Sequence, residues 1–144
     1  MLNFKNILVA YDSSGFSNRA FKSALDIAEP KSQITIVTVL TGIYQPSIGF
    51  SMKYSKDLLD KETKILNNIF SKLQATAKKK DILLSLKILQ NNSVSKAILD
   101  YVNSHKYDLI VIGSHGRTGL NKMILGSVAN AVSQQSKIPV MVVK

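Results

Sequence analysis

The chain has 144 residues, of which 45% are apolar, and it contains no cysteine. This length suits one domain with a real core, and the missing cysteines exclude disulfides, thiolate metal sites and thiol chemistry. The sequence has no run of 18 apolar residues and its first residues do not have the form of a signal peptide. We therefore expect a single domain over residues 1–144, located in the cytoplasm and without a membrane span.

The charge of the chain is strongly basic, with 19 lysines and arginines against nine acids and a formal net charge of +10. Such a balance favours anionic partners, among them nucleotides, nucleic acid and anionic membrane surfaces. Arg19 and Arg117 are the only arginines, whereas surfaces that read bases rely on arginine. We interpret most of the charge as a solvated lysine surface and expect no specific nucleic acid partner and no membrane partner.

Strand and helix signals alternate along the whole chain. Short runs rich in apolar or β-branched residues predict strands, and apolar residues at spacings of three and four predict helices. Pro30 ends the first helix, and the longest helix carries an apolar stripe that includes Ile65 and Leu66. The expected elements are strands at 7–10, 34–40, 82–89, 109–112 and 139–143, helices at 17–29, 54–80, 93–105 and 127–136, and loops at 41–53 and 113–126.

This regular alternation predicts the fold class. Strands that alternate with helices form a parallel sheet with helices on both faces, so we expect a single-domain α/β fold with an open five-stranded parallel sheet. Right-handed crossovers in such a sheet place a ligand at the carboxyl ends of the strands, at the switch point.

The most informative segment is glycine-rich. Four of the seven glycines, Gly113, Gly116, Gly119 and Gly126, fall in 14 residues between a buried strand and a helix. Glycine allows a positive φ or a close approach of backbone to ligand, and a helix N-terminus binds phosphate through free N–H groups and the helix dipole. Ser127 is placed either to cap this helix or to offer its hydroxyl to phosphate. The segment predicts phosphate binding, and the alternative is an ordinary strand-to-helix connection.

The glycine spacing matches neither of two common phosphate loops, since the sequence lacks G-x-x-x-x-G-K-[ST] and has no G-x-G-x-x-G after its first strand. Instead, GSHGRTGLNKMILGS at 113–127 fits G-x2-G-x9-G-[ST] and resembles the universal stress protein family. The resemblance includes NILVAYDSS near the start and PVMVV near the end, so it covers essentially the whole chain. It points to the ATP-binding branch of that family, with an adenine nucleotide alpha hydrolase-like, Rossmann-like fold.

The resemblance implies a nucleotide site. Asp12 would accept hydrogen bonds from the ribose, although an Asx-turn or a helix cap is its other interpretation. Val39 would meet the adenine edge through its backbone, Gly113 would lie near the ribose, and main-chain N–H groups would surround the phosphates. Ser13 stands where many members have glycine, which leaves the ribose geometry open. The implied nucleotide-binding residues are Ala10, Tyr11, Asp12, Val39, Gly113, Ser114, His115, Gly116, Arg117, Gly126, Ser127 and Val128.

The implied function is that of an ATP-binding regulatory protein of the stress response. The resemblance predicts a homodimer through the strand at 139–143 and an unknown regulatory protein partner, with Mg²⁺ or Mn²⁺ held by the phosphates. Asp12 is the only acid expected near the nucleotide, so we expect no catalytic residue, no protein-held metal and at most slow hydrolysis. ADP, AMP and a cyclic nucleotide stay open as ligands.

Other functional classes were weighed beside this one. A weak or conditional ATPase and a dimeric stress scaffold without turnover are the alternatives. A phospho-receiver domain shares the alternating order, but it needs an acid after the central strand, where this chain has Gln90-Asn91-Asn92. The receiver interpretation is therefore disfavoured.

Overall fold

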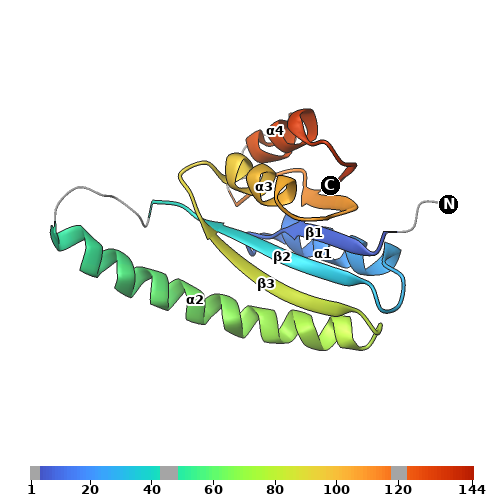
Figure 1. Cartoon of the computed structure of the whole chain (residues 1–144), viewed down its shortest axis with the longest axis horizontal. Helices are drawn as coiled ribbons and strands as arrows, with labels where there is room; N and C mark the ends of the chain where they lie inside the picture. The colour runs from blue at the N-terminus through green and yellow to red at the C-terminus, as the bar shows by residue number, and fades with distance from the viewer. Residues whose placement is uncertain (1–3, 43–48, 118–122) are drawn as a thin grey trace.

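The computed structural model describes residues 4–42, 49–117 and 123–144. Five strands and four helices alternate within these residues, as the sequence predicts (Figure 1). In chain order they are β1 (Asn6–Ala10), α1 (Gly15–Ile27), β2 (Gln33–Leu40), α2 (Gly49–Lys78), β3 (Leu83–Gln90), α3 (Val94–Asn103), β4 (Leu109–Gly113), α4 (Ser127–Gln135) and β5 (Val140–Val143).

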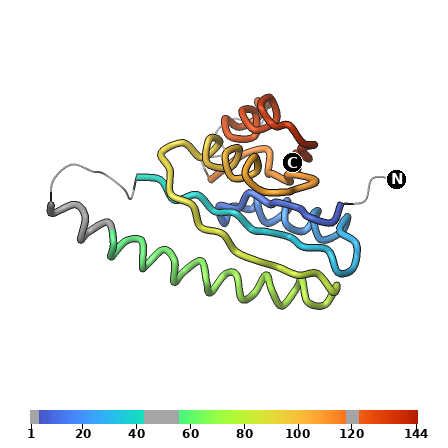
Figure 2. Tube along the Cα trace, in the orientation of Figure 1, coloured from blue at the N-terminus to red at the C-terminus, as the bar shows by residue number. Residues whose placement is uncertain are grey.

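The strands form one parallel sheet in the order β3-β2-β1-β4-β5. The chain builds outward from β1 to β3 and then returns to place β4 on the other side of β1, a path that can be followed in Figure 2. Ile7 of β1 therefore lies between Ile34 of β2 and Leu109 of β4. The predicted α/β fold with an open five-stranded parallel sheet is confirmed, and its switch point lies between β1 and β4.

Helices cover both faces of the sheet. Successive side chains of a strand point to opposite faces, and the core accordingly divides into two clusters. Ile7 and Val9 pack on one face with Phe21 of α1, while Leu8 packs on the other face with Ile98 of α3. Figure 1 shows α3 and α4 together on one side of the sheet and α2 on the other.

The predicted boundaries are wrong at one place. The loop expected over 41–53 ends earlier, because α2 begins at Gly49; the part of that loop at 43–48 lies outside the described residues. Glycine is tolerated at a helix start, where the first N–H groups have no partner within the helix in any case. The other predicted boundaries differ from the observed ones by at most two residues.

The apolar stripe of α2 is narrower than predicted. Ile65 was expected to face the core, but 44% of it is exposed, whereas Leu66 is only 5% exposed. The physical reason is the position of the helix over β3, which is an edge strand. A helix that rests on the margin of a sheet buries only the middle of its apolar stripe. No helix among the described residues has the length and apolarity to cross a membrane.

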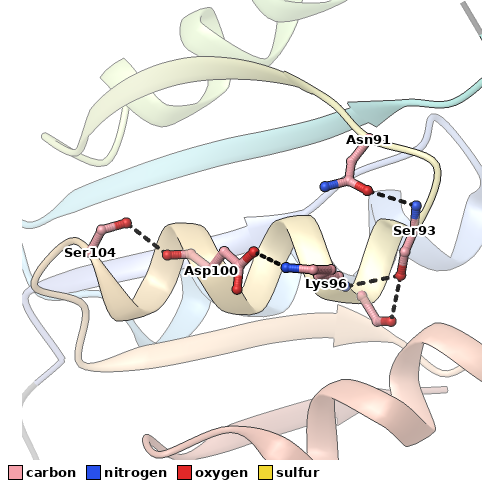
Figure 3. Close-up of polar contacts among 6 residues, drawn as sticks. Asn91, Ser93, Lys96, Asp100 and Ser104 are labelled. Carbon is pink, nitrogen blue, oxygen red and sulfur yellow. Dashed lines mark hydrogen bonds and ion pairs between the residues drawn. The ribbon is translucent and has the colours of Figure 1, made fainter. Parts of the chain in front are cut away.

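The helix α3 is fixed by its own polar side chains (Figure 3). Ser93 caps it by accepting from the Lys96 N–H at 3.3 Å, and the Asn91 side chain accepts from the Ser93 N–H at 2.9 Å. One turn on, Lys96 and Asp100 form an ion pair at 2.7 Å, and the Ser104 hydroxyl donates to the Asp100 carbonyl. These contacts satisfy the ends and the exposed side of α3, while Ile98 and Val102 on its other side are buried.

Candidate functional site

A cavity of about 400 Å³ opens at the carboxyl end of the sheet, between the ends of β1, β2 and β4 on one side and α3 and α4 on the other. All the predicted nucleotide-binding residues except Ser114 and Arg117 line it. The lining also contains residues that were not predicted to bind a nucleotide: Ser17, Val37, Val94, Ile98, Ile112, Ile124, Leu125 and Ala129. The inner lining is apolar, and the charged or polar side chains lie toward the turns.

The β1–α1 turn supplies a carboxylate to this cavity. Asp12 accepts from the Ser14 N–H through Oδ1 at 2.9 Å, so its interpretation as an Asx-turn is confirmed. The helix cap is Ser14 instead, whose hydroxyl accepts from the Ser17 N–H at 3.1 Å. A Cβ placed on Gly116 would lie 3.2 Å from the second oxygen of Asp12, Oδ2. That oxygen therefore faces the glycine-rich segment across the cavity, as a hydrogen-bond acceptor.

Tyr11 anchors the end of β1. Its hydroxyl donates to the Asn18 side chain at 2.6 Å, and only 5% of the residue is exposed. Burial, and then the charge of Asp12, raise the pKa of Tyr11, while a hydrogen bond with Ser13 lowers it by less. Tyr11 is therefore a neutral donor at physiological pH that ties the turn to α1.

The glycines of the β4–α4 segment permit close approaches. A Cβ on Gly113 would lie 2.7 Å from the Phe16 Cβ, and one on Gly126 would lie 2.8 Å from the Ser114 carbonyl oxygen. Among the described glycines only Gly42 has a positive φ, at 71°. Positive φ therefore does not explain Gly113, Gly116 and Gly126, and the close approaches at Gly113 and Gly126 are to other parts of the chain. Close approach of this backbone to a ligand stays a prediction. Gly119 lies outside the described residues.

His115 and Arg117 brace this segment. The Nε2–H of His115 donates to the Ile124 carbonyl at 2.6 Å, since a carbonyl can only accept, and its Nδ1 meets the Ser114 hydroxyl at 2.9 Å. Arg117 donates from Nε to the main-chain carbonyl of Asp12 at 2.6 Å. Together they join the two ends of the segment and tie it to the β1–α1 turn. Their contact with phosphate stays a prediction.

The start of α4 faces the cavity without a side-chain cap. Gly126 is the capping residue and Ser127 is the first residue of the helix, so the cap, one of the two roles considered for Ser127, does not apply. A capping side chain must precede the first helical turn, and Ser127 lies within it. Its exposed hydroxyl and the first N–H groups of α4 are placed to meet an anion.

The site combines an apolar slot with a polar mouth. The slot between the sheet and α3 suits a flat apolar ring, the Asp12 carboxylate suits a hydroxylated group, and the start of α4 suits an anion. Among the described residues no three His, Asp or Glu side chains come together as metal ligands. Asp12 is likewise the only acid in the described lining of the cavity.

Comparison with known proteins identifies the family. The model of the universal stress protein family matches residues 3–144. The chain belongs to the universal stress protein family. Universal stress protein YxiE of Bacillus subtilis is 32% identical over 152 aligned residues, which cover 98% of this chain and 99% of that protein.

Solved universal stress proteins share the fold. UspA from Lactobacillus plantarum has a TM-score of 0.87 at 25% identity, with 99% of each chain covered. Two more distant structures carry a nucleotide. One is a universal stress protein in complex with cAMP, with a TM-score of 0.70, 22% identity and coverage of 98% of this chain and 97% of that one. The other is an Arabidopsis thaliana family member with AMP bound, with a TM-score of 0.67, 17% identity and coverage of 97% and 91%.

Proposed function

We propose that this universal stress protein binds ATP in the cavity at the switch point and acts as a nucleotide-dependent regulator in the stress response. The observation that carries the proposal is the convergence on one cavity of an apolar slot, the Asp12 carboxylate and the uncapped start of α4. Each part of a nucleotide meets a matching chemical group there. The base enters the slot, the ribose hydroxyls donate to Asp12, and the phosphates accept from the N–H groups of Ser127 and Val128.

Family members with AMP and cAMP bound support an adenine nucleotide as the ligand class. Within that class, the resemblance of the G-x2-G-x9-G-[ST] spacing to the ATP-binding branch of the family supports ATP as the ligand. Mg²⁺ or Mn²⁺ would be held mainly by phosphate oxygens and water, since the described lining offers one carboxylate, that of Asp12, and it serves the β1–α1 turn and the ribose.

We also propose that turnover is slow. Rapid hydrolysis needs a group that orients water and stabilises the developing charge, and no acid besides Asp12 lines the described part of the cavity. The protein then functions through its bound state, which a regulatory protein partner in the cytoplasm reads. A weak or conditional ATPase is the alternative. Steady-state phosphate release well above about one per second that is lost in Asp12→Ala would contradict slow turnover and would assign Asp12 to catalysis.

A homodimer completes the proposal. β5 is an edge strand whose four residues are apolar and half-buried, and such an edge invites pairing. Antiparallel pairing of two copies of β5 would cover both edges. Sedimentation at micromolar concentration should give about twice 15.8 kDa, and Val142→Pro should shift the protein toward monomer; a monomeric wild type would contradict the dimer.

The decisive experiment is direct. Nucleotide released by acid from the purified protein is identified by mass, and calorimetry with ATP, ADP, AMP, cAMP and GTP ranks the ligands. We expect ATP to bind most tightly and Asp12→Ala to weaken it by roughly 10-fold through the lost ribose hydrogen bonds. A protein that carries no nucleotide and shows no heat with ATP would refute the proposal.

A further inference from the structure

The hydrogen-bonded pairing of β1 and β2 ends at the cavity. Their register ends at Ala10 and Val37, and one last main-chain bond follows, from the Tyr11 N–H to the Val37 carbonyl at 2.9 Å. If the parallel ladder continued, the Val39 N–H would donate to the Tyr11 carbonyl. Within residues 4–42 no such bond is present, and the Tyr11 carbonyl instead accepts from the Thr38 hydroxyl at 2.8 Å.

The register fixes where the backbone of Val39 points. In a parallel ladder the N–H and C=O of one residue face the same neighbouring strand, and alternate residues face alternate neighbours. Val37 faces β1, so Val39 also faces the β1 side. There β1 has ended and the cavity begins, with Val39 in its lining. Both main-chain groups of Val39 therefore face the cavity.

We propose that Thr38 is a positioning residue for base recognition, because its hydroxyl occupies the Tyr11 carbonyl and so keeps the Val39 N–H available to a ligand. Thr38 is 5% exposed and does not itself line the cavity. The inference rests on the proposed nucleotide site and on the adenine contact that the family resemblance implies for Val39, and it adds the residue that positions this contact. Without the Thr38 hydroxyl, the buried Tyr11 carbonyl would lack its donor. The Val39 N–H is the next donor in the strand register, so it would bond to this carbonyl and extend the β1–β2 ladder by one hydrogen bond.

The main-chain N–H and C=O of Val39 together match one kind of base edge. One N–H donor and one C=O acceptor on the same residue match a base edge that carries a ring nitrogen acceptor beside an exocyclic amino donor. Adenine has this edge, whereas purine itself lacks the amino group. A donor and an acceptor placed side by side thus select the 6-aminopurine by hydrogen bonds that solvent cannot replace inside an apolar slot.

The first test needs no nucleotide. Amide hydrogen exchange by NMR on the ligand-free protein should show the Val39 amide exchanging much faster than the Val37 amide, which lies within the ladder. In Thr38→Val the Val39 amide should become about 5-fold more protected, since it gains a hydrogen bond worth roughly 1 kcal/mol. A Val39 amide as protected as Val37 in the wild type would overturn the inference.

The second test measures base recognition by calorimetry, with ATP and with its 1-deaza and 7-deaza analogues, each of which replaces one ring nitrogen beside the amino group by C–H and so removes one acceptor for the Val39 N–H. We expect the wild type to prefer ATP over one of the two analogues by about 3- to 10-fold, the range for one neutral hydrogen bond. Thr38→Val should bring this ratio close to one, and Thr38→Ser, which keeps the hydroxyl, should preserve it.

Thr35 offers a matched control. It lies in the same strand with the same 5% exposure, and its hydroxyl pairs with that of Ser85 at 3.2 Å, outside the cavity lining. Thr35→Val should leave the ratio unchanged. If the wild type fails to bind ATP, the proposed function is wrong. The exchange rate of the Val39 amide in the ligand-free protein would still test the role of Thr38. If the wild type binds ATP and Thr38→Val keeps its preference, the proposed function stands and the role of Thr38 is wrong.

Discussion

The two turns that frame the cavity are held closed by different kinds of hydrogen bond. The β1–α1 turn is closed by side chains, in which Asp12 accepts from Ser14 and Ser14 accepts from Ser17. The β4–α4 segment is closed by a main-chain bond, from the Gly126 N–H to the Ser114 carbonyl at 2.7 Å, and is braced by the His115 and Arg117 side chains, none of which caps α4. Both turns lead from a buried strand into a helix at the switch point.

Because of this difference, we expect the β1–α1 turn to contribute mainly to stability and the start of α4 to contribute mainly to ligand binding. Side chains that cap α1 satisfy the first N–H groups of that helix, so this end stabilises the fold and offers only a carboxylate to a ligand. The start of α4 lacks a side-chain cap, and the absence of Cβ atoms at Gly113 and Gly126 lets the backbone close tightly around the cavity. We expect substitutions in the first turn to lower stability and those at the start of α4 to lower affinity.

The largest effect is expected at Gly113. A Cβ there would lie within 3.0 Å of three atoms of Phe16, two of them main-chain atoms. Gly113→Ala should therefore lower the free energy of unfolding by about 3 kcal/mol, the upper end for overpacking, as measured by urea denaturation. Gly116→Ala is the control, since its Cβ meets only the Asp12 carboxylate. Equal stability of the two variants would contradict the close packing of α1 against β4.

Ser127→Ala should weaken ATP binding and leave the fold intact. The lost hydrogen bond to a charged phosphate corresponds to about 2 kcal/mol, or roughly 30-fold in affinity. The free energy of unfolding should not change, because Gly126 rather than Ser127 is the cap. Calorimetry and denaturation of the same preparation measure both quantities. A loss of stability with unchanged affinity would show that the hydroxyl serves the helix instead.

Ser14→Ala should show the opposite behaviour. It removes the hydroxyl that accepts from the Ser17 N–H, and the loss of such a cap lowers the free energy of unfolding by about 1 kcal/mol. ATP affinity should change by less than about 2-fold, because Ser14 does not line the cavity. Thermal unfolding with and without ATP tests this, and unchanged stability would count against the cap.

The smallest effect concerns Ser13, which has a φ of 69°. A left-handed conformation disfavours residues with a Cβ by about 1–2 kcal/mol, part of which glycine returns through its greater freedom when unfolded. Ser13→Gly should therefore be more stable than Ser13→Ala by roughly 0.5 kcal/mol. Both variants lose the serine hydroxyl, so the difference isolates the backbone. Greater stability of the alanine variant would refute the strain.

Local sequence patterns predicted most of the fold. Buried runs such as 7–10 and the spacing of apolar residues in 17–29 depend on near neighbours, and the structure agrees with them to within two residues. The glycine-rich segment was located in the same way. The exposure of Ile65 could not be predicted from local sequence patterns, because it follows from the order of the strands, which places α2 at the margin of the sheet.

The site was predicted less completely than the fold. A motif names the residues that it contains, so Val94 and Ile98, which reach the cavity from α3, carried no signal of their own. The bracing roles of His115 and Arg117 depend on partners nine and 105 positions away. From the sequence, Thr38 cannot be distinguished from other β-branched strand residues. Its role depends on the end of β1, where the Tyr11 carbonyl accepts from its hydroxyl.

The position of β3 and α2 has a consequence for motion. No residue of either element is in the cavity lining in the parts of the chain that the structure describes, and β3 has a strand neighbour on one side only. Proteins open in cooperative units of unequal stability, and a ligand suppresses only those openings that disrupt its site. The β3–α2 pair can therefore open and close while the cavity stays occupied. Its amides should exchange at the same rate with and without ATP, while those of β1 and β4 slow when ATP binds.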